Sequence, residues 1–492
     1  MIPNKTAGTS PEEQPSPRVP SPALYPQYDA SRSLSSHELN TIAPTKSRSQ
    51  PGRDRRDDGS KQHGDSGEQA YDDAPQATQW ATNQTHSHEK ANWQLVSACL
   101  MNFGNGMNDS APGALIPYLE KDYHIGYAIV SLIFIANAVG FILAAPLTHT
   151  IKAKIGHYKS YALSMGLVTV SYIAIVCHPP FAVIVAAFLL LGFGMAMSIA
   201  MNNVFCANLH NSTTALGCFS GAYGIGGVIS PLFATAMVSH DIRWTYFYTI
   251  TLAVAVANLL LSSFAFRSYD ENATMASQMA PDSAIPPMAS NNDNSPGRLQ
   301  MLNKAIQNRT TILGSLFIFA YQGAEVSVSG WIVSFLINYR GGDSRSVGYV
   351  SAGFWAGITV GRFLIVYPAH RIGEKVIVGV LVVGSIAFQL MTWLIPNIIG
   401  EAVAVAILGL LLGPLYPCST AVFAKLLSRQ MQLVSLSFIS ALGSSGGAVF
   451  PFLTGILAQQ VGTMVLHPIC LALYAAMLIT WCSLPAISKR SE

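Results

Sequence analysis

"TTILGSLFIFAYQGAEVSVSGWIVSFLI", residues 310–337, is an apolar run with a single carboxylate, Glu325, near its middle. A membrane-spanning helix needs about 20 consecutive, mainly apolar residues, and this run is long enough. A charged side chain at the bilayer centre costs roughly 2.5–3.5 kcal/mol on insertion scales, so intramembrane carboxylates are rare and mark functional or paired groups. The run therefore predicts a transmembrane helix with a polar site inside it.

The rest of the chain has the same apolar character. Its 492 residues are 50% hydrophobic and 11% charged, whereas soluble domains average about 25% charged residues. Because lipid offers no hydrogen bonds to the backbone, long apolar runs of this kind form helices. We predict an all-α integral membrane protein with twelve spans: 93–119, 128–151, 160–177, 181–206, 213–239, 243–266, 310–337, 346–367, 376–395, 401–425, 432–458 and 465–485.

Polar segments divide the chain into four predicted parts. Residues 1–92 are rich in Ser, Pro, Gln and Asp and cannot bury a core, so we expect a disordered cytoplasmic tail. Residues 93–266 form a first six-helix half, 267–309 a cytoplasmic linker, and 310–487 a second six-helix half. With the N-terminus inside, nine Lys and Arg residues flank the spans on the inner side and four on the outer side, so both termini are expected in the cytoplasm.

Composition also excludes several classes of partner and cofactor. The net charge of +3 does not indicate a nucleic-acid partner. The seven cysteines lie in or beside apolar runs without CxxC spacing, so we expect no disulfide framework and no metal site. The chain has no GxxxxGK[ST] loop and no nucleophile–base spacing in its spans, so we expect neither ATP use, nor a cofactor, nor an enzyme.

The two predicted halves repeat each other. "SGAYGIGGVISP" (220–231) aligns with "SALGSSGGAVFP" (440–451) at an offset of 220 residues. Small residues let membrane helices approach closely, so we predict helix packing and gating for the paired positions Gly226, Gly227 and Pro231, and Gly446, Gly447 and Pro451. The chain is therefore expected to contain two homologous six-helix halves.

This plan is similar to that of the major facilitator superfamily. Three stretches resemble its fucose–proton symporter-like branch as found in fungi: "GMNDSAPGALIPYLEKDY" (106–123), "GAEVSVSGWIVSFL" (323–336) and "GYVSAGFWAGITVGR" (348–362). The resemblance implies twelve helices, alternating access and a proton-accepting acid in the first span.

Asp109 and Glu325 are the candidates for proton coupling or substrate binding. Asp109 lies in 93–119 among polar neighbours that include Asn105 and Asn108, and the resemblance places the proton-accepting acid in this span. Two alternatives remain open: Asp109 is simply hydrated near the end of its span, or Glu325 forms a structural ion pair with Arg362.

Further residues are candidates for lining a substrate cavity. Asn105 and Asn108 of 93–119 are two of them. Gln322 and Trp331 flank Glu325, and Trp355 lies in 346–367. Asn202 lies in 181–206, where it either contacts the substrate or joins helices by hydrogen bonds.

The predicted function is secondary active transport of a small organic solute, coupled to protons. We expect a monomer in the lipid bilayer of the plasma membrane. Export of a metabolite is favoured slightly, because 181–206 lacks the acid expected for sugar–proton symport. The alternatives are a sugar or polyol uptake symporter and a non-transporting nutrient sensor that signals through its tail.

Overall fold

The computed structural model describes residues 74–207, 209, 212–267, 304 and 307–485. The chain divides into two compact units, Met1–Tyr71 and Asp72–Glu492, and every described residue belongs to the second. Residues 1–73 of the predicted tail and nearly all of the predicted linker lie outside the described residues. The part of the predicted tail that is described, 74–92, is helical, because the first helix begins at Ala74 rather than near Trp93.

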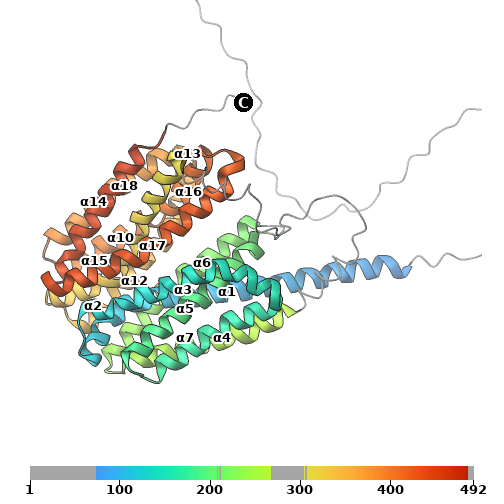
Figure 1. Ribbon diagram of the computed structural model, residues 1–492, viewed down its shortest axis with the longest axis horizontal. Coiled ribbons are helices and arrows are strands. Elements are labelled where there is room, and N and C mark those ends of the chain that lie inside the picture. Colours follow the sequence, from blue (N-terminus) through green and yellow to red (C-terminus); the bar gives the residue numbers. More distant parts are fainter. Residues whose placement is uncertain (1–73, 208, 210–211, 268–303, 305–306, 486–492) are drawn as a thin grey trace, which may run out of the picture. The chain divides into compact units, whose positions relative to one another are not determined.

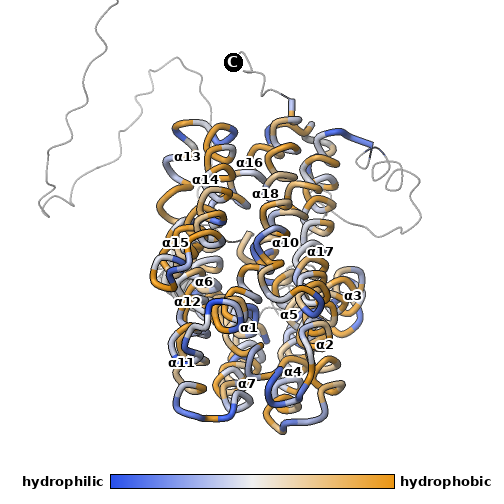
Figure 2. The backbone as a smooth tube through the Cα atoms, turned by 90° about the vertical axis from the view of Figure 1, so that its left-hand side faces the viewer, coloured by the Kyte–Doolittle hydropathy of each residue, from blue (hydrophilic) through white to orange (hydrophobic). Residues whose placement is uncertain are grey.

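The first half contains six long helices and two short ones (Figure 1). They are α1 (Ala74–Tyr123), α2 (Tyr127–Val130), α3 (Leu132–Ile155), α4 (His157–Val176), α5 (Phe181–Ala207), α6 (Ser212–Ser239), the 3₁₀ turn η1 (Trp244–Tyr246) and α7 (Phe247–Ala265). Hydrophobic residues cover most of their length (Figure 2).

The second half repeats this order with more interruptions. It contains α10 (Arg309–Asn338), α11 (Ser344–Val347), α12 (Tyr349–Leu364), α13 (Val366–Ile372), α14 (Glu374–Leu394), α15 (Ile398–Leu412), α16 (Leu415–Leu426), α17 (Arg429–Val461), the 3₁₀ turn η2 (Thr463–Val465) and α18 (Leu466–Cys482). The span predicted at 401–425 is divided between α15 and α16 at Gly413 and Pro414, where the proline lacks a backbone N–H to continue the helix.

Ten helical segments of the described chain are long and apolar enough to cross a membrane. The two predicted spans outside this group are those of α1 and α12. The membrane part of α1 is made polar by Asn102, Asn105, Asn108 and Asp109. Helix α12 has only 16 residues, Tyr349–Leu364, and is too short to be counted as a span on its own. Each half therefore supplies six spans, and one span in each half, α1 or α12, departs from a uniform apolar helix.

The repeat in sequence is also a repeat in packing. Gly226 of α6 lies against the backbone carbonyl of Phe103 in α1, and Gly446 of α17 lies against the carbonyl of Phe319 in α10. At both positions a side chain would collide with backbone atoms. Pro231 and Pro451 lie inside α6 and α17. The same close helix contact thus occurs once in each half.

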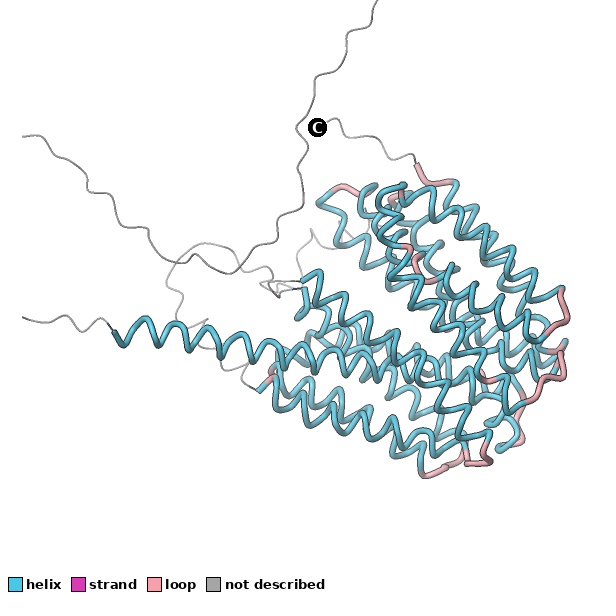
Figure 3. Tube along the Cα trace, turned by 180° about the vertical axis from the view of Figure 1, so that it is seen from behind, coloured by secondary structure: helices cyan, strands magenta, loops and turns pink. Residues whose placement is uncertain are grey.

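The two halves approach each other at one end of their helices and diverge at the other (Figures 1 and 3). We call the diverging end, which includes Ile155, Ala265, Arg309 and Ile372, the linker side, and the approaching end, which includes Tyr123, Ser239, Asn338 and Val461, the far side.

Contacts between the halves close the far side. The Tyr118 hydroxyl donates to the carbonyl oxygen of Ser344 at 2.8 Å. The buried ring of Trp331 packs against Tyr127 and Phe134, with ring centroids 5.7 and 6.4 Å away. Because α10 supplies the tryptophan while α2 and α3 supply its neighbours, this aromatic group joins the two halves.

Candidate functional site

A cavity of about 280 Å³ lies between the two halves. Residues of α1, α3, α5 and α6 line it from the first half, and residues of α10, α12 and α17 line it from the second. Ligand pockets typically measure roughly 300–1,000 Å³. The cavity is therefore close to the size needed for a small solute.

Asp109 contributes a carboxylate to this cavity from the first half. Its Oδ2 accepts a hydrogen bond of 2.8 Å from the Tyr223 hydroxyl of α6. Its Oδ1 accepts a longer one, 3.5 Å, from the amide of Asn108. Among the ion pairs of the described residues, none includes Asp109. The carboxylate thus has hydrogen-bond donors but no cationic partner there.

Glu325 contributes the second carboxylate, from the middle of α10. It is buried, and its Oε1 lies 3.7 Å from Nη2 of Arg362 in α12. The Arg362 side chain keeps 27% of its surface exposed. A separation of 3.7 Å permits an ion pair but is too long for a good hydrogen bond. The Arg362 guanidinium thus faces Glu325, whereas no ion pair of the described residues includes Asp109.

Trp355 provides an aromatic surface beside these acids. Its indole N–H donates to Oγ of Ser329 at 2.9 Å, which fixes the orientation of the ring. The ring lies 6.0 Å from that of Tyr223 in an edge-to-face arrangement. Gly227 of α6 packs directly against the ring, where a side chain would collide with it. Gln322 and Gly447 also line the cavity.

The cavity has one polar wall and one mainly apolar wall. The polar wall comes from α1, α6, α10, α12 and α17 and carries the acids, amides and hydroxyls. The apolar wall comes from α3 and α5 and consists chiefly of Ile133, Phe134, Phe141, Ile142, Phe188 and Ile199. Such a site suits a solute that has hydrogen-bonding groups on one face and an apolar or ring face opposite.

Three of the predicted cavity residues lie elsewhere. Asn105 donates to Oδ1 of Asn102 at 3.4 Å and lines a separate small pocket between α1, α4 and α7. Asn202 accepts a 2.8 Å hydrogen bond from Tyr161, so its side chain joins α4 and α5. Trp331 belongs to the far-side closure, and its indole N–H donates to the carbonyl of Pro451. Another helix thus binds the polar groups of Asn202 and Trp331, whereas Asn105 is bonded to Asn102 of its own helix.

The sequence reasoning missed several cavity residues. Tyr223 lies between glycines in the repeated segment of α6, and Ser444 and Ser445 occupy the aligned part of α17. Polar side chains in a glycine-rich membrane helix are a pattern from which these cavity residues could have been predicted. Asn137 of α3 also lines the cavity, and its Oδ1 has no hydrogen-bond partner among the described residues.

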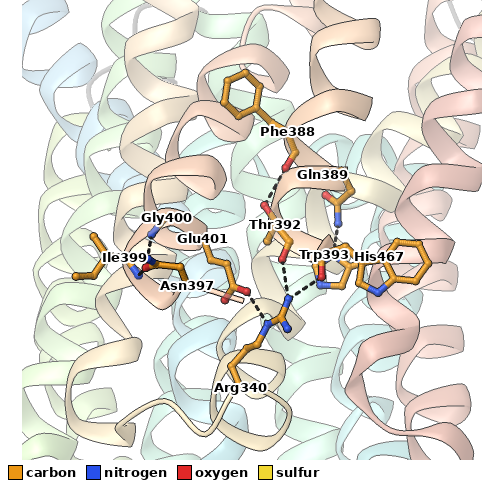
Figure 4. Close-up of polar contacts among 10 residues, drawn as sticks. All are labelled: Arg340, Phe388, Gln389, Thr392, Trp393, Asn397, Ile399, Gly400, Glu401 and His467. Carbon is orange, nitrogen blue, oxygen red and sulfur yellow. Dashed lines mark hydrogen bonds and ion pairs between the residues drawn. The ribbon is translucent and has the colours of Figure 1, made fainter. Parts of the chain in front are cut away.

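A buried charged cluster lies at the far-side end of the second half, away from the cavity (Figure 4). Nε of Arg340 lies 2.5 Å from Oε1 of Glu401, whose side chain is fully buried. Arg340 also donates to the carbonyls of Thr392 and Trp393 at the end of α14. His467 of α18 stacks on Trp393. The cluster therefore joins the ends of α10, α14, α15 and α18.

The first half has a polar cluster at the corresponding ends of its helices. Oδ2 of Asp122, at the end of α1, accepts hydrogen bonds from His178 at 2.6 Å and from Trp244 at 2.8 Å. Burial raises the pKa of Asp122, but the two hydrogen bonds and the nearby charges of His178 and Arg243 together hold the pKa below its ordinary value. This cluster joins the end of α1 to η1 and to the segment between α4 and α5.

The described residues contain no group of three His, Cys, Asp or Glu side chains placed to hold a metal ion. All seven cysteines, which lie within the described part of the chain, are free. The polar groups of the cavity are therefore carboxylates, amides, hydroxyls and an indole.

Comparisons with known proteins agree with this architecture. The sequence profile of the Major Facilitator Superfamily matches residues 98–398. The chain is 26% identical to "Bypass of stop codon protein 6" of Saccharomyces cerevisiae over 434 residues, covering 81% of this chain and 84% of the yeast protein. It is 23% identical to the glucose/mannose transporter GlcP of Bacillus subtilis over 363 residues, covering 72% of this chain and 85% of that protein.

A solved structure has the same fold. The bacterial homologue of the human lysosomal transporter Spinster, in an inward-facing and unoccupied conformation, superimposes with a TM-score of 0.63. The identity is 12%, and the match covers 80% of this chain and 96% of that one. The predicted fold class, with two six-helix halves, is confirmed.

Proposed function

The chain belongs to the Major Facilitator Superfamily and is a secondary transporter rather than an enzyme, and we propose that it couples a small uncharged polar solute to protons. The similarity to a glucose/mannose transporter supports a sugar or polyol as the solute. The two walls of the cavity also support it, because a sugar ring has hydroxyl groups at its edge and an apolar face.

The observation that supports proton coupling is the environment of the Asp109 carboxylate. It faces a cavity shared by both halves, it has hydrogen-bond donors, and no ion pair of the described residues includes it. A carboxylate in a partly dry site binds a proton more readily than one in water. Asp109 is therefore positioned to take up a proton and to release it when its surroundings change.

The conformation fits one stage of alternating access. The far side is closed by the Tyr118–Ser344 hydrogen bond and the Trp331 group, while the halves diverge at the linker side (Figure 3). With the linker in the cytoplasm, this is a state in which the cavity communicates with the inside. Rocking of the halves about the cavity would expose it to the other side.

Flux in proteoliposomes tests the proposal. Purified protein is supplied with radiolabelled hexoses and polyols, with and without an imposed pH gradient, in both directions. We expect Asp109→Asn to lower gradient-driven accumulation at least tenfold, and Asp109→Glu, which still titrates, to retain a substantial part of it. Equal accumulation by the wild type with and without the gradient would contradict proton coupling.

The same experiment decides the direction of transport. The preference for export rests on the sequence of 181–206, whereas similarity to GlcP supports transport of a sugar without giving its direction. Net movement of solute with the proton gradient would establish symport, and movement against it antiport. Absence of flux for every solute, together with binding, would instead favour the sensor function.

Localisation to the plasma membrane, with both termini in the cytoplasm, belongs to the same proposal. The cytoplasmic position of both termini rests on the excess of Lys and Arg on the linker side. Tags at residues 1 and 492 should be protected from antibody in intact cells and become accessible after permeabilisation.

A further inference from the structure

The pair α6–α12 is a contact between the halves that passes beside the cavity. Helix α6 belongs to the first half and α12 to the second. Gly224 of α6 lies against the side chain of Thr359, and Gly227 lies against the ring of Trp355. Because glycine brings these helices close together, a movement of one half relative to the other must change their contact.

Tyr223 lies in this contact and has two partners, one in each half. Its ring packs edge-to-face against Trp355 of the second half, with centroids 6.0 Å apart. Its hydroxyl donates to Oδ2 of Asp109 in the first half at 2.8 Å. The indole N–H of Trp355 is in turn held by Ser329 of α10, so the tryptophan ring is fixed to the second half.

We propose that Tyr223 is a positioning residue that makes the proton affinity of Asp109 depend on the relative placement of the two halves. The inference rests on the proposed proton-coupled function. A hydroxyl that donates to a carboxylate favours its ionised form. While Trp355 supports the tyrosine ring, the hydroxyl is held on Asp109 and proton release is favoured, in the conformation that diverges at the linker side.

Rocking of the halves would reverse this preference. When α12 moves along α6, Trp355 no longer supports the ring of Tyr223 in its present place. The hydroxyl then loses its fixed position, and the carboxylate takes up a proton more readily. The proton is thus bound while the far side is open and released at the linker side, which links the direction of proton movement to the transport cycle.

A second tyrosine near the same acid provides a control. The hydroxyl of Tyr172 in α4 donates to Oδ1 of Asn108 at 3.3 Å. Its ring lies 6.0 Å from that of Tyr248 in α7, so these contacts remain within the first half. Removing the Tyr172 hydroxyl deletes a buried polar contact close to Asp109 without touching the α6–α12 interface.

The test compares Tyr223→Phe with Tyr172→Phe in proteoliposomes. Two quantities are measured on each variant: solute exchange without a proton gradient, and accumulation driven by a gradient. We expect the ratio of accumulation to exchange to fall at least tenfold in Tyr223→Phe and to stay within about twofold in Tyr172→Phe. The pH profile of accumulation should also shift toward higher pH in Tyr223→Phe, because its acid has lost a donor.

A second variant keeps the proposal testable if Tyr223→Phe is poorly expressed. Trp355→Phe retains the tyrosine hydroxyl but removes the hydrogen bond to Ser329 that fixes the ring, so its accumulation-to-exchange ratio should fall as well. If Tyr223→Phe and Trp355→Phe both kept the wild-type accumulation-to-exchange ratio and pH profile, the role of Tyr223 would be overturned and proton coupling would stand. If the wild-type protein accumulated the solute equally with and without the gradient, both the role of Tyr223 and proton coupling would be overturned.

Discussion

Replacing Glu401 by Gln removes the charge from a carboxylate whose side chain is fully buried beside Arg340. The arginine would keep its other contacts. It donates to the carbonyl of Trp393 at 2.6 Å, and its guanidinium lies 5.3 Å from each of the rings of Phe335 and Tyr339. The charge of Arg340, whose side chain is only 13% exposed, would then lack its anionic partner.

The magnitude follows from which charge is left unpaired. Breaking a buried ion pair by removing one partner costs about 3–5 kcal/mol. Glu401→Gln should lie near the lower end, about 3 kcal/mol, because carbonyls and aromatic rings still stabilise the arginine. Arg340→Met should lie near the upper end, about 5 kcal/mol, because the buried carboxylate loses its cationic partner. The double variant Arg340→Met/Glu401→Gln should cost only about 2 kcal/mol, since no buried charge remains.

The assay is reversible unfolding in mixed detergent–SDS micelles, with the free energy of unfolding measured for the four proteins of this double-mutant cycle. Non-additivity of several kcal/mol is the expected result. If both single variants stayed within about 0.5 kcal/mol of the wild type, or if the two losses simply added, the pair would not be a buried stabilising contact and the reasoning would be refuted.

Three other changes test different parts of the structure. Glu325→Gln should fold at least as well as the wild type yet lose transport or shift its pH optimum; poor folding that Arg362→Gln restores would make the pair at 3.7 Å structural instead. Gly226→Ala should lower the free energy of unfolding by about 1–3 kcal/mol, because its Cβ would meet the backbone of α1. The control Gly217→Ala has open space around its Cβ and should be neutral or slightly stabilising. Equal effects of the two substitutions would contradict the packing argument. Asp122→Asn should lower thermal stability at neutral pH. The folded-state pKa of Asp122 is depressed, so its contribution to stability is complete above the ordinary pKa of 3.8 and is lost as pH falls through the lower folded value. A stability difference between Asp122→Asn and the wild type that persisted at still lower pH would contradict this role of the carboxylate.

The positions of the helices along the chain were largely predictable from the sequence, whereas the direction in which individual side chains point was not. Apolar runs locate spans because lipid requires backbone groups to be paired within each helix. The rotation of a helix about its axis depends on its neighbours. For this reason the sequence predicts Trp331 in the cavity and leaves two alternatives for Asn202, whereas the structure places both in helix-joining contacts. Asp109 and Glu325 do line the cavity, and their roles remain predictions.

Contacts between residues far apart in the chain were beyond sequence reasoning. Arg340 was counted only as a basic loop residue, and its partner Glu401 lies at the start of another span. The Tyr223–Trp355 contact depends on how two halves that share no continuous helix come together. Neither pairing leaves a periodic pattern, because each depends on tertiary geometry rather than on spacing along the chain.

The two far-side clusters bear on how the polypeptide is assembled during synthesis. The Asp122 cluster uses only residues up to Trp244, so the first half can complete it before the second half leaves the ribosome. The far-side cluster of the second half is built on the Arg340–Glu401 ion pair and on backbone carbonyls. Helices that docked onto the wrong repeat would bring a guanidinium to indole and imidazole donors, or an aspartate to backbone carbonyls. The different partners that Asp122 and Arg340 require would therefore disfavour docking of helices onto the wrong half.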